Sequence, residues 1–153
     1  MIRLSELEVD EEQKSYEVIG TAYIGKNAIQ SFCEYHPKCS IANFVNMEDL
    51  FKLEDEGKIK DGSFPTEITL VSGKRIIVAE MTDYIKGICV DFITLTLDKR
   101  NNTEIQIIVN PAHLLAVTER RRSKYSIVNT TSSKELFVLE DAETILKMMP
   151  ENN

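Results

Sequence analysis

Tryptophan is absent from the 153-residue sequence, histidine occurs twice and cysteine three times. An odd number of cysteines without even spacing does not supply the disulfide framework of a small extracellular domain, so reduced thiols in a reducing compartment are expected. No apolar run approaches the roughly 18 residues of a membrane span, and the acidic opening MIRLSELEVDEE lacks the hydrophobic stretch of a signal peptide. These absences predict a cytoplasmic protein that does not associate with membranes.

Positive charge is also scarce, because 18 basic residues face 25 acidic ones and the net charge is −7. This balance argues against general binding to nucleic acid, which requires a basic surface. The apolar content of 42% and the charged content of 28% are those of a soluble globular protein. The length suffices for one ordinary domain or two very small ones.

The motifs of common enzyme classes are missing as well. The sequence contains no P-loop, no G-x-G-x-x-G and no nucleophile elbow. His113 has no serine or cysteine placed by motif as its nucleophile, and pairs of carboxylates arise by chance in so acidic a chain. We therefore expect a protein that is not an enzyme and carries no cofactor.

What the sequence does contain is an internal repeat. The segment EITLVSGKRIIVAEMTDYI (67–85) reads as a hairpin that runs into a glutamate and a short helix, and KYSIVNTTSSKELFVLEDAETIL (124–146) has the same pattern. The corresponding positions are Lys74 and Lys134, Ile76 and Leu136, Ile77 and Phe137, Val78 and Val138, Glu80 and Glu140, and Ile85 and Ile145. The second copy is expected to use a longer turn, NTTSSK, without the glycine of SGK.

The segments upstream of the two hairpins correspond too. AYIGKNAIQSF (22–32) matches IIVNPAHLLAV (107–117), and MIRLSEL (1–7) matches DFITLTL (91–97). Because four elements recur in the same order, we predict an α+β, mainly β fold of two tandem small antiparallel β units, each closed by a short helix. The units cover residues 1–88 and 91–149. The alternative is that unrelated hairpins look alike, since period-two alternation and polar turns are common.

The first unit alone carries an insertion, residues 33–65. Within it Asn46 is expected to cap a short helix that ends at Gly57, and this helix either packs on the first unit or serves a function of its own. The alternation of apolar residues places five further positions in the core: Ile68, Leu70, Val109, Leu136 and Val138.

The second unit also matches a known pattern. It consists of a strand like ITLT, a hairpin into I-x-V-N-P, an apolar stretch ending near a glutamate, a second hairpin and V-x-E before a short helix. The match is carried by Ile93, Leu95, Ile107, Val109, Asn110, Pro111, Val117, Glu119, Val138 and Glu140. In these features the unit resembles the small flagellar and swarming-motility proteins of the FlbD/SwrD type, and the whole chain resembles a tandem duplicated, decorated version.

The resemblance implies a small β fold, and it implies no catalytic residues, because the family has no known catalytic residue set. The family is associated with flagellar motor output and swarming. Its members are typically a single unit, often with a glycine in each hairpin turn, where this chain has Asn101-Asn102 and Ser132-Ser133. The resemblance therefore speaks more for the fold than for a role in motility.

FCEYHPKC places three metal-binding side chains, Cys33, His36 and Cys39, within seven residues. Cys89 or His113 would have to supply a fourth ligand for zinc. A Cys-x₂-His-x₂-Cys spacing without a second cysteine pair matches known zinc sites poorly. We therefore favour the alternative, a loop with reduced cysteines and no metal.

The only concentrated basic feature is ERRRSKY, from Glu119 to Tyr125. Its candidate interaction residues are Arg120, Arg121, Arg122, Lys124 and Tyr125. The arginines are able to bind a phosphate or pair with glutamates, and the tyrosine is able to stack on a base. Since the rest of the chain is acidic, a protein contact is favoured, and we predict a homo-oligomeric protein-interaction or assembly module with this loop near a subunit contact. Binding of a small ligand or nucleic acid by residues 119–125 is the alternative.

Overall fold

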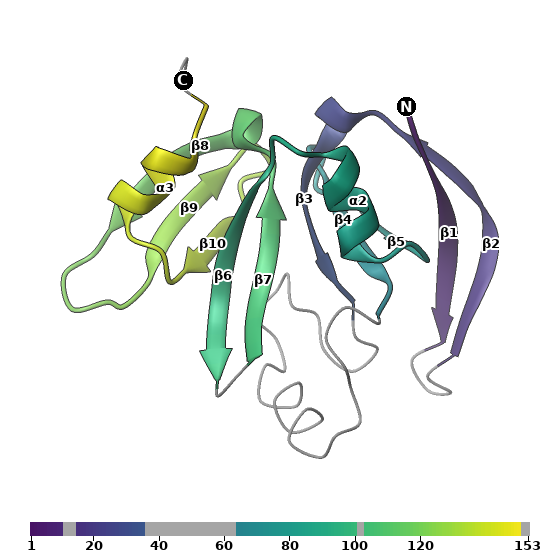
Figure 1. The fold of residues 1–153 in the computed structure, drawn as a ribbon, viewed down its shortest axis with the longest axis horizontal. Helices are drawn as coiled ribbons and strands as arrows, with labels where there is room; N and C mark the ends of the chain where they lie inside the picture. The colour runs from purple at the N-terminus through teal and green to yellow at the C-terminus, as the bar shows by residue number, and fades with distance from the viewer. Residues whose placement is uncertain (11–14, 36–63, 101–102, 151–153) are drawn as a thin grey trace.

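The computed structural model describes residues 1–10, 15–35, 64–100 and 103–150 (Figure 1). The described chain is mainly β, with two sheets and two short α-helices, in agreement with the predicted fold class. The helix expected between Asn46 and Gly57 lies outside the described residues, as does most of the insertion.

The described residues of the first half of the chain form five strands, a 3-10 turn and a helix. In order these are β1 (Ile2–Asp10), β2 (Ser15–Ile24), η1 (Lys26–Ala28), β3 (Ile29–Glu34), β4 (Thr66–Leu70), β5 (Arg75–Val78) and α2 (Thr82–Ile88). The second half follows with β6 (Ile93–Arg100), β7 (Thr103–Val109), η3 (Pro111–His113), β8 (Leu114–Glu119), β9 (Ser126–Thr130), β10 (Glu135–Val138) and α3 (Ala142–Met148). The two series contain the same kinds of element in the same order.

The sheets do not divide where the two series divide. One sheet has seven strands in the order β2-β1-β5-β4-β3-β7-β6, and the other has three in the order β10-β9-β8; all neighbours are antiparallel. β10 nevertheless lies beside β6 in the way that β5 lies beside β1. Leu139 N donates a hydrogen bond to Thr96 O (2.8 Å), and at the equivalent place Ala79 N donates one to Ser5 O (2.9 Å). The strand neighbours of the second series therefore run β7-β6-β10-β9-β8.

The glutamate after each hairpin ties the hairpin to the first strand of its series. The Glu80 carboxylate accepts hydrogen bonds from Ser5 N (2.8 Å) and Ser5 Oγ (3.2 Å). Glu140 accepts from Thr96 N (2.8 Å) and Thr96 Oγ1 (2.8 Å) in the same way. The repeated glutamate of the sequence thus has one structural role in both places.

The expectation of a longer turn in the second hairpin is wrong. The four residues between Leu70 and Arg75 have their counterpart in the four between Thr130 and Glu135. Gly73 has φ of 89° in the first turn and Ser133 has φ of 66° in the second. Serine adopts the left-handed conformation that glycine takes in the first turn, so the loss of the glycine did not lengthen the turn.

Two apolar cores lie under the sheets. The first core contains Ile2, Leu4, Ile24, Ile29, Phe32, Ile68, Val78, Ile85, Cys89, Phe92 and Ile108. The second core contains Cys33, Ile93, Leu95, Leu97, Ile105, Ile107, Val109, Val128, Leu136, Val138 and Ile145. Four of the five predicted core residues are buried, and Leu70 is partly buried against the first core.

Each core takes at least one side chain from the other half of the chain. Cys33 of β3 packs in the second core, while Ile108 of β7 and Phe92, which precedes β6, pack in the first. The strands β3 and β7 are neighbours in the seven-stranded sheet, so the exchange occurs where the two halves meet.

Candidate functional site

The contact between β3 and β7 joins the two series. Ser31 pairs with Val109 and Phe32 with Ile108 in an antiparallel arrangement. Asn110 extends the contact, because its backbone N donates to Gln30 O (2.8 Å) and its side-chain Nδ2 donates to the carbonyl of Ile29 (3.0 Å). We call this contact the junction.

Polar groups surround the junction. Gln30 is 0% exposed, and its Oε1 accepts a hydrogen bond from Ser132 N (3.0 Å) in the turn between β9 and β10. Its Nε2 has no hydrogen-bond partner in the described part of the chain. His113 Nε2 lies 2.6 Å from the carbonyl of Asn27, which places the ring in a backbone contact and not beside a nucleophile.

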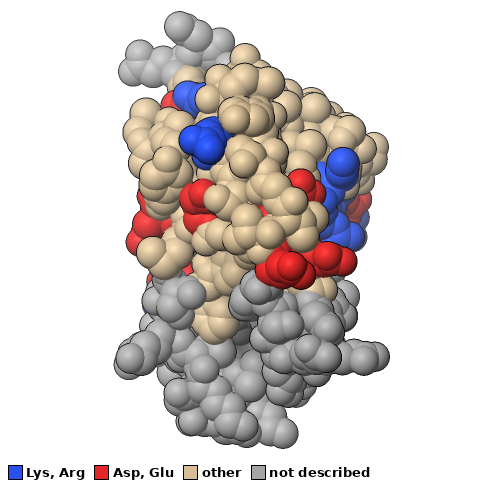
Figure 2. Space-filling model, turned by 90° about the vertical axis from the view of Figure 1, so that its right-hand side faces the viewer, with Lys and Arg blue, Asp and Glu red and all other residues tan. Residues whose placement is uncertain are grey.

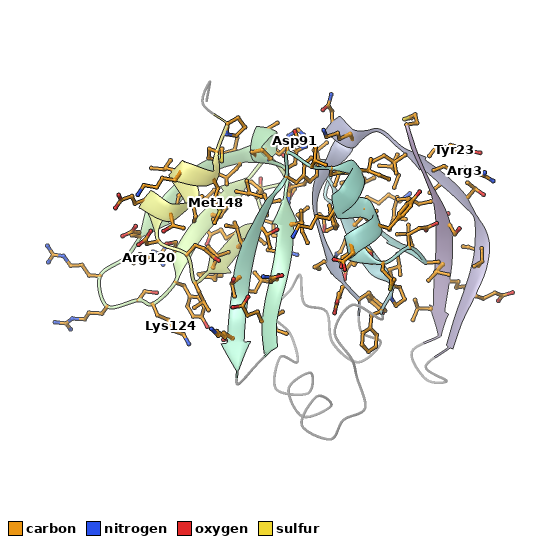
Figure 3. The ribbon with its side chains drawn as sticks, viewed as in Figure 1. Arg3, Tyr23, Asp91, Arg120, Lys124 and Met148 are labelled. Atoms are coloured by element: carbon orange, nitrogen blue, oxygen red, sulfur yellow. The ribbon has the colours of Figure 1, made fainter. Side chains whose placement is uncertain are left out.

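An ion pair between Lys26 and Asp91 also links the two halves; Figure 3 labels Asp91. The hydrogen bond from Lys26 lowers the pKa of the Asp91 carboxyl, and the same bond raises the pKa of Lys26. Both side chains are exposed, so this ion pair contributes little to stability.

The junction leaves two strand edges without a partner among the described strands. β2 ends the seven-stranded sheet beyond β1, and β8 ends the three-stranded sheet beyond β9. On β2, Val18, Ile19 and Tyr23 are exposed apolar side chains, and on β8 Leu115 is one. Figure 2 looks on to the side of the molecule that carries β2 and shows mostly uncharged surface, with basic side chains at the upper left and on the right, above a group of acidic side chains.

β3 pairs with β4 in the same register as β8 pairs with β9, but the side chains of β3 and β8 differ in exposure. An irregularity follows Ile29 in one strand and Leu114 in the other, at the same point of the register. All residues of β3 before Glu34 are buried, whereas every residue of β8 is exposed or half-buried. The clearest difference is between Gln30, 0% exposed, and its counterpart Leu115, 66% exposed.

The basic loop follows β8 and projects from the end of the molecule opposite Tyr23 (Figure 3). Arg122 has φ of 65°, and Ser123 stabilises the turn through a backbone bond to Arg120 O (3.3 Å) and a side-chain bond from Tyr125 N (3.2 Å). The loop thus has a defined backbone, with Arg120, Arg121, Arg122 and Lys124 exposed and Tyr125 half-buried.

The arginines of this loop have no acidic partner within the described chain. No carboxylate there forms an ion pair with Arg120, Arg121 or Arg122. Glu119 instead accepts a hydrogen bond from Ala142 N (2.7 Å) at the start of α3. Lys124 Nζ lies 5.0 Å from the centre of the Tyr125 ring and occupies one face of it.

The candidate metal ligands are not assembled in the part of the chain that the structure describes, where no group of three His, Cys, Asp or Glu side chains is suitable for a metal. His36 and Cys39 lie outside the described residues. Cys33 packs in the second core and Cys89 in the first. Burial raises the pKa of the Cys89 thiol, which keeps it protonated and poorly nucleophilic.

Sequence reasoning found the basic loop, and the number of short strands led us to expect exposed edges that pair with a partner or with copies of the chain, but it did not single out β2 and β8. Tyr23 and Leu115 looked like ordinary members of alternating strands, and only the aligned segments 22–32 and 107–117 placed each beside a buried counterpart. None of the described helices is long and apolar enough to cross a membrane. No model of a known protein family matches the chain, and no curated protein or solved structure is significantly similar to it.

Proposed function

We propose that the protein is a non-enzymatic, homo-oligomeric assembly module of the cytoplasm, built from two tandem copies of one β unit. The copies are residues 1–88, with the insertion at residues 33–65, and residues 91–149. The identical element order, the matching hairpin registers and the paired glutamates support this duplication.

The observation that carries the assembly role is the pair of edges at β2 and β8, which have no partner among the described strands. An edge strand presents backbone N–H and C=O groups that favour pairing with another chain, and a protein with such edges covers or charges them. Here each edge has a single glutamate, Glu17 on β2 and Glu119 on β8, and otherwise carries exposed apolar side chains. Pairing between copies satisfies the backbone groups and removes those side chains from water.

The resemblance to the FlbD/SwrD type is consistent with an assembly role, because it brings no catalytic residues with it. Its match lies in the second unit, at residues such as Asn110, which extends the junction, and Pro111, which begins η3. This resemblance alone suggests a role in motility.

A second candidate function is favoured by the basic loop. Its arginines have no acidic partner in the described chain, so they are available to an anion or a nucleic-acid backbone. The net charge of −7 opposes the long-range approach of nucleic acid, which is why we place assembly first.

Light scattering after size exclusion tests the assembly role. We expect a mass above the 17.4 kDa of one chain at low and moderate salt and at two protein concentrations. Changing Arg120, Arg121 and Arg122 together to alanine should weaken assembly, most clearly at moderate salt, where the remaining charge is screened. A monomer under all conditions would refute the role. Normal assembly by the triple variant with a loss of oligonucleotide binding, measured by fluorescence anisotropy, would establish the second candidate.

A further inference from the structure

The edge strands β2 and β8, unpaired on one side among the described strands, are the counterparts of the two strands that form the junction. β8 occupies in the second series the place that β3 has in the first, and β2 occupies in the first the place that β7 has in the second. Within the chain, the edge of β3 pairs with the edge of β7. The equivalent edges, those of β8 and β2, have no partner among the described strands.

We propose that β8 of one copy pairs with β2 of a second copy in the register of the junction. This inference rests on the proposed assembly function and specifies its interface. At the junction Ser31 lies opposite Val109, and the equivalent pair in the proposed contact is Ala116 opposite Ile24 of the second copy. Phe32 lies opposite Ile108, and the equivalent pair is Val117 opposite Tyr23 of the second copy. The hydrogen bond from Asn110 N to Gln30 O has as its counterpart a hydrogen bond from Gly25 N of the second copy to Leu115 O.

The side chains that meet in this register are complementary in size. At the junction a large side chain on β3, Phe32, meets a smaller one on β7, Ile108. In the proposed contact the smaller side chain, Val117, is on β8 and the larger, Tyr23, is on β2, so similar total volumes face each other. Pairs of large and small residues of this kind fill a shared core without voids.

The contact also explains why these side chains are exposed in a single chain. Ile108 is 5% exposed because it enters the first core from the neighbouring half, whereas its counterpart Tyr23 is 62% exposed. Val117 already packs against the second core, and pairing brings Tyr23 of the second copy on to it. Leu115 approaches the turn between β4 and β5 of that copy, as Gln30 approaches the turn between β9 and β10.

Charge favours the same arrangement. The antiparallel direction carries the basic loop beyond Glu119 toward the start of β2 in the second copy. There Glu17 lies directly opposite Glu8 of β1, and both are exposed. Like charges opposite one another on paired strands are unfavourable. The arginines of the first copy relieve that repulsion in the second copy.

The assembly is head to tail, because its two edges lie on different parts of one chain. Tyr23 and the basic loop are at opposite ends of the long axis in Figure 3. A contact between unlike edges leaves one of each kind at the ends of the complex, so it extends to a closed ring or an open filament. Two copies related by a two-fold axis would instead pair β2 with β2 or β8 with β8.

Disulfide trapping distinguishes these arrangements. Thr118 and Ala22 follow next in the proposed register, and neither is buried. In a Cys39→Ser background, a Thr118→Cys variant is mixed with an Ala22→Cys variant under reducing conditions and then oxidised. We expect a disulfide between positions 118 and 22 of different chains, identified by mass spectrometry, since paired residues have the Cα separation that a disulfide requires. Thr131→Cys, at another exposed site, replaces Thr118→Cys as the control and should not cross-link.

Disulfides joining two copies of position 22, or two of position 118, would overturn the proposal, as would an oligomer that forms none of these bonds. A wild-type protein that is monomeric would refute the assembly function itself, which separates the two failures. As a second readout, Tyr23→Lys should convert the oligomer to a 17.4 kDa monomer. Tyr84→Lys, at a tyrosine on α2 that is 56% exposed, should leave the oligomer intact.

Discussion

Ser133 adopts a backbone conformation that costs a serine about 1–2 kcal/mol relative to a right-handed one. Its counterpart Gly73 has φ of 89° and no neighbouring atom within 4 Å of an added Cβ. The equivalent position of the two turns is thus filled by a strained serine in the second hairpin and by an unstrained glycine in the first.

Ser133→Gly should therefore stabilise the protein. Removing the strain outweighs the extra flexibility of glycine in the unfolded chain, and we expect a gain of about 0.5–1 kcal/mol. Thermal denaturation measures it. Gly73→Ser is the matched control and should lower Tm, and an unchanged or lower Tm in Ser133→Gly would contradict the equivalence of the two turns.

Leu136 is a test of the core at the residue scale. It is 1% exposed in the second core, so Leu136→Ala should cost about 2–4 kcal/mol through lost burial and a residual cavity. Chemical denaturation measures the loss. Glu135→Ala, at the exposed neighbouring position, should change stability by less than about 0.5 kcal/mol, and equal effects would show the strand faces to be assigned wrongly.

At the scale of elements, the two helices differ in how they begin. Asp141 precedes α3 and accepts a hydrogen bond from Thr144 N (2.8 Å), whereas Met81 precedes α2 without a side-chain cap. The first turn of α2 therefore lacks a side-chain acceptor that α3 has.

Met81→Asp should supply the missing acceptor and raise stability by about 0.5–2 kcal/mol at neutral pH. The effect should depend on pH in the way it does for Asp141, whose pKa is lowered by its hydrogen bond with Thr144. A carboxyl with a lowered folded-state pKa stabilises above its unfolded pKa and loses that contribution as pH falls through the folded value. Melting curves from neutral to acidic pH should thus show the gain disappearing in acid; a gain independent of pH would contradict capping.

The elements were largely predictable, and their assembly was not. Both hairpins, both helices after the glutamates and the turns at Gly25 and Asn110 follow from alternation and turn residues, which act locally. The pairing of β3 with β7 depends on which of several similar edges meet in space, and no local pattern encodes that choice. For the same reason the basic loop was recognised from its composition, whereas Tyr23 was not recognised as a contact residue.

For the whole molecule, the exchange of Cys33 and Ile108 between the cores predicts that the two halves unfold together. We expect calorimetry of the Tyr23→Lys variant, in which subunit dissociation does not contribute, to give one transition with equal calorimetric and van't Hoff enthalpies. Ile108→Ala should lower that single Tm even though it removes a side chain of the second half from the first core. Two resolved transitions would show that the halves fold independently.

The insertion interrupts only the first of the two series, between β3 and β4; the predicted start at Cys33 is two residues early, because Cys33 and Glu34 still pair with β4 as part of β3. In a ring or filament of such chains the successive units are alternately decorated and plain. The repeat distance of the assembly is then two units, although the strand contacts recur at every unit. Any ligand that recognises the insertion would bind at every second unit, with a stoichiometry of one per chain.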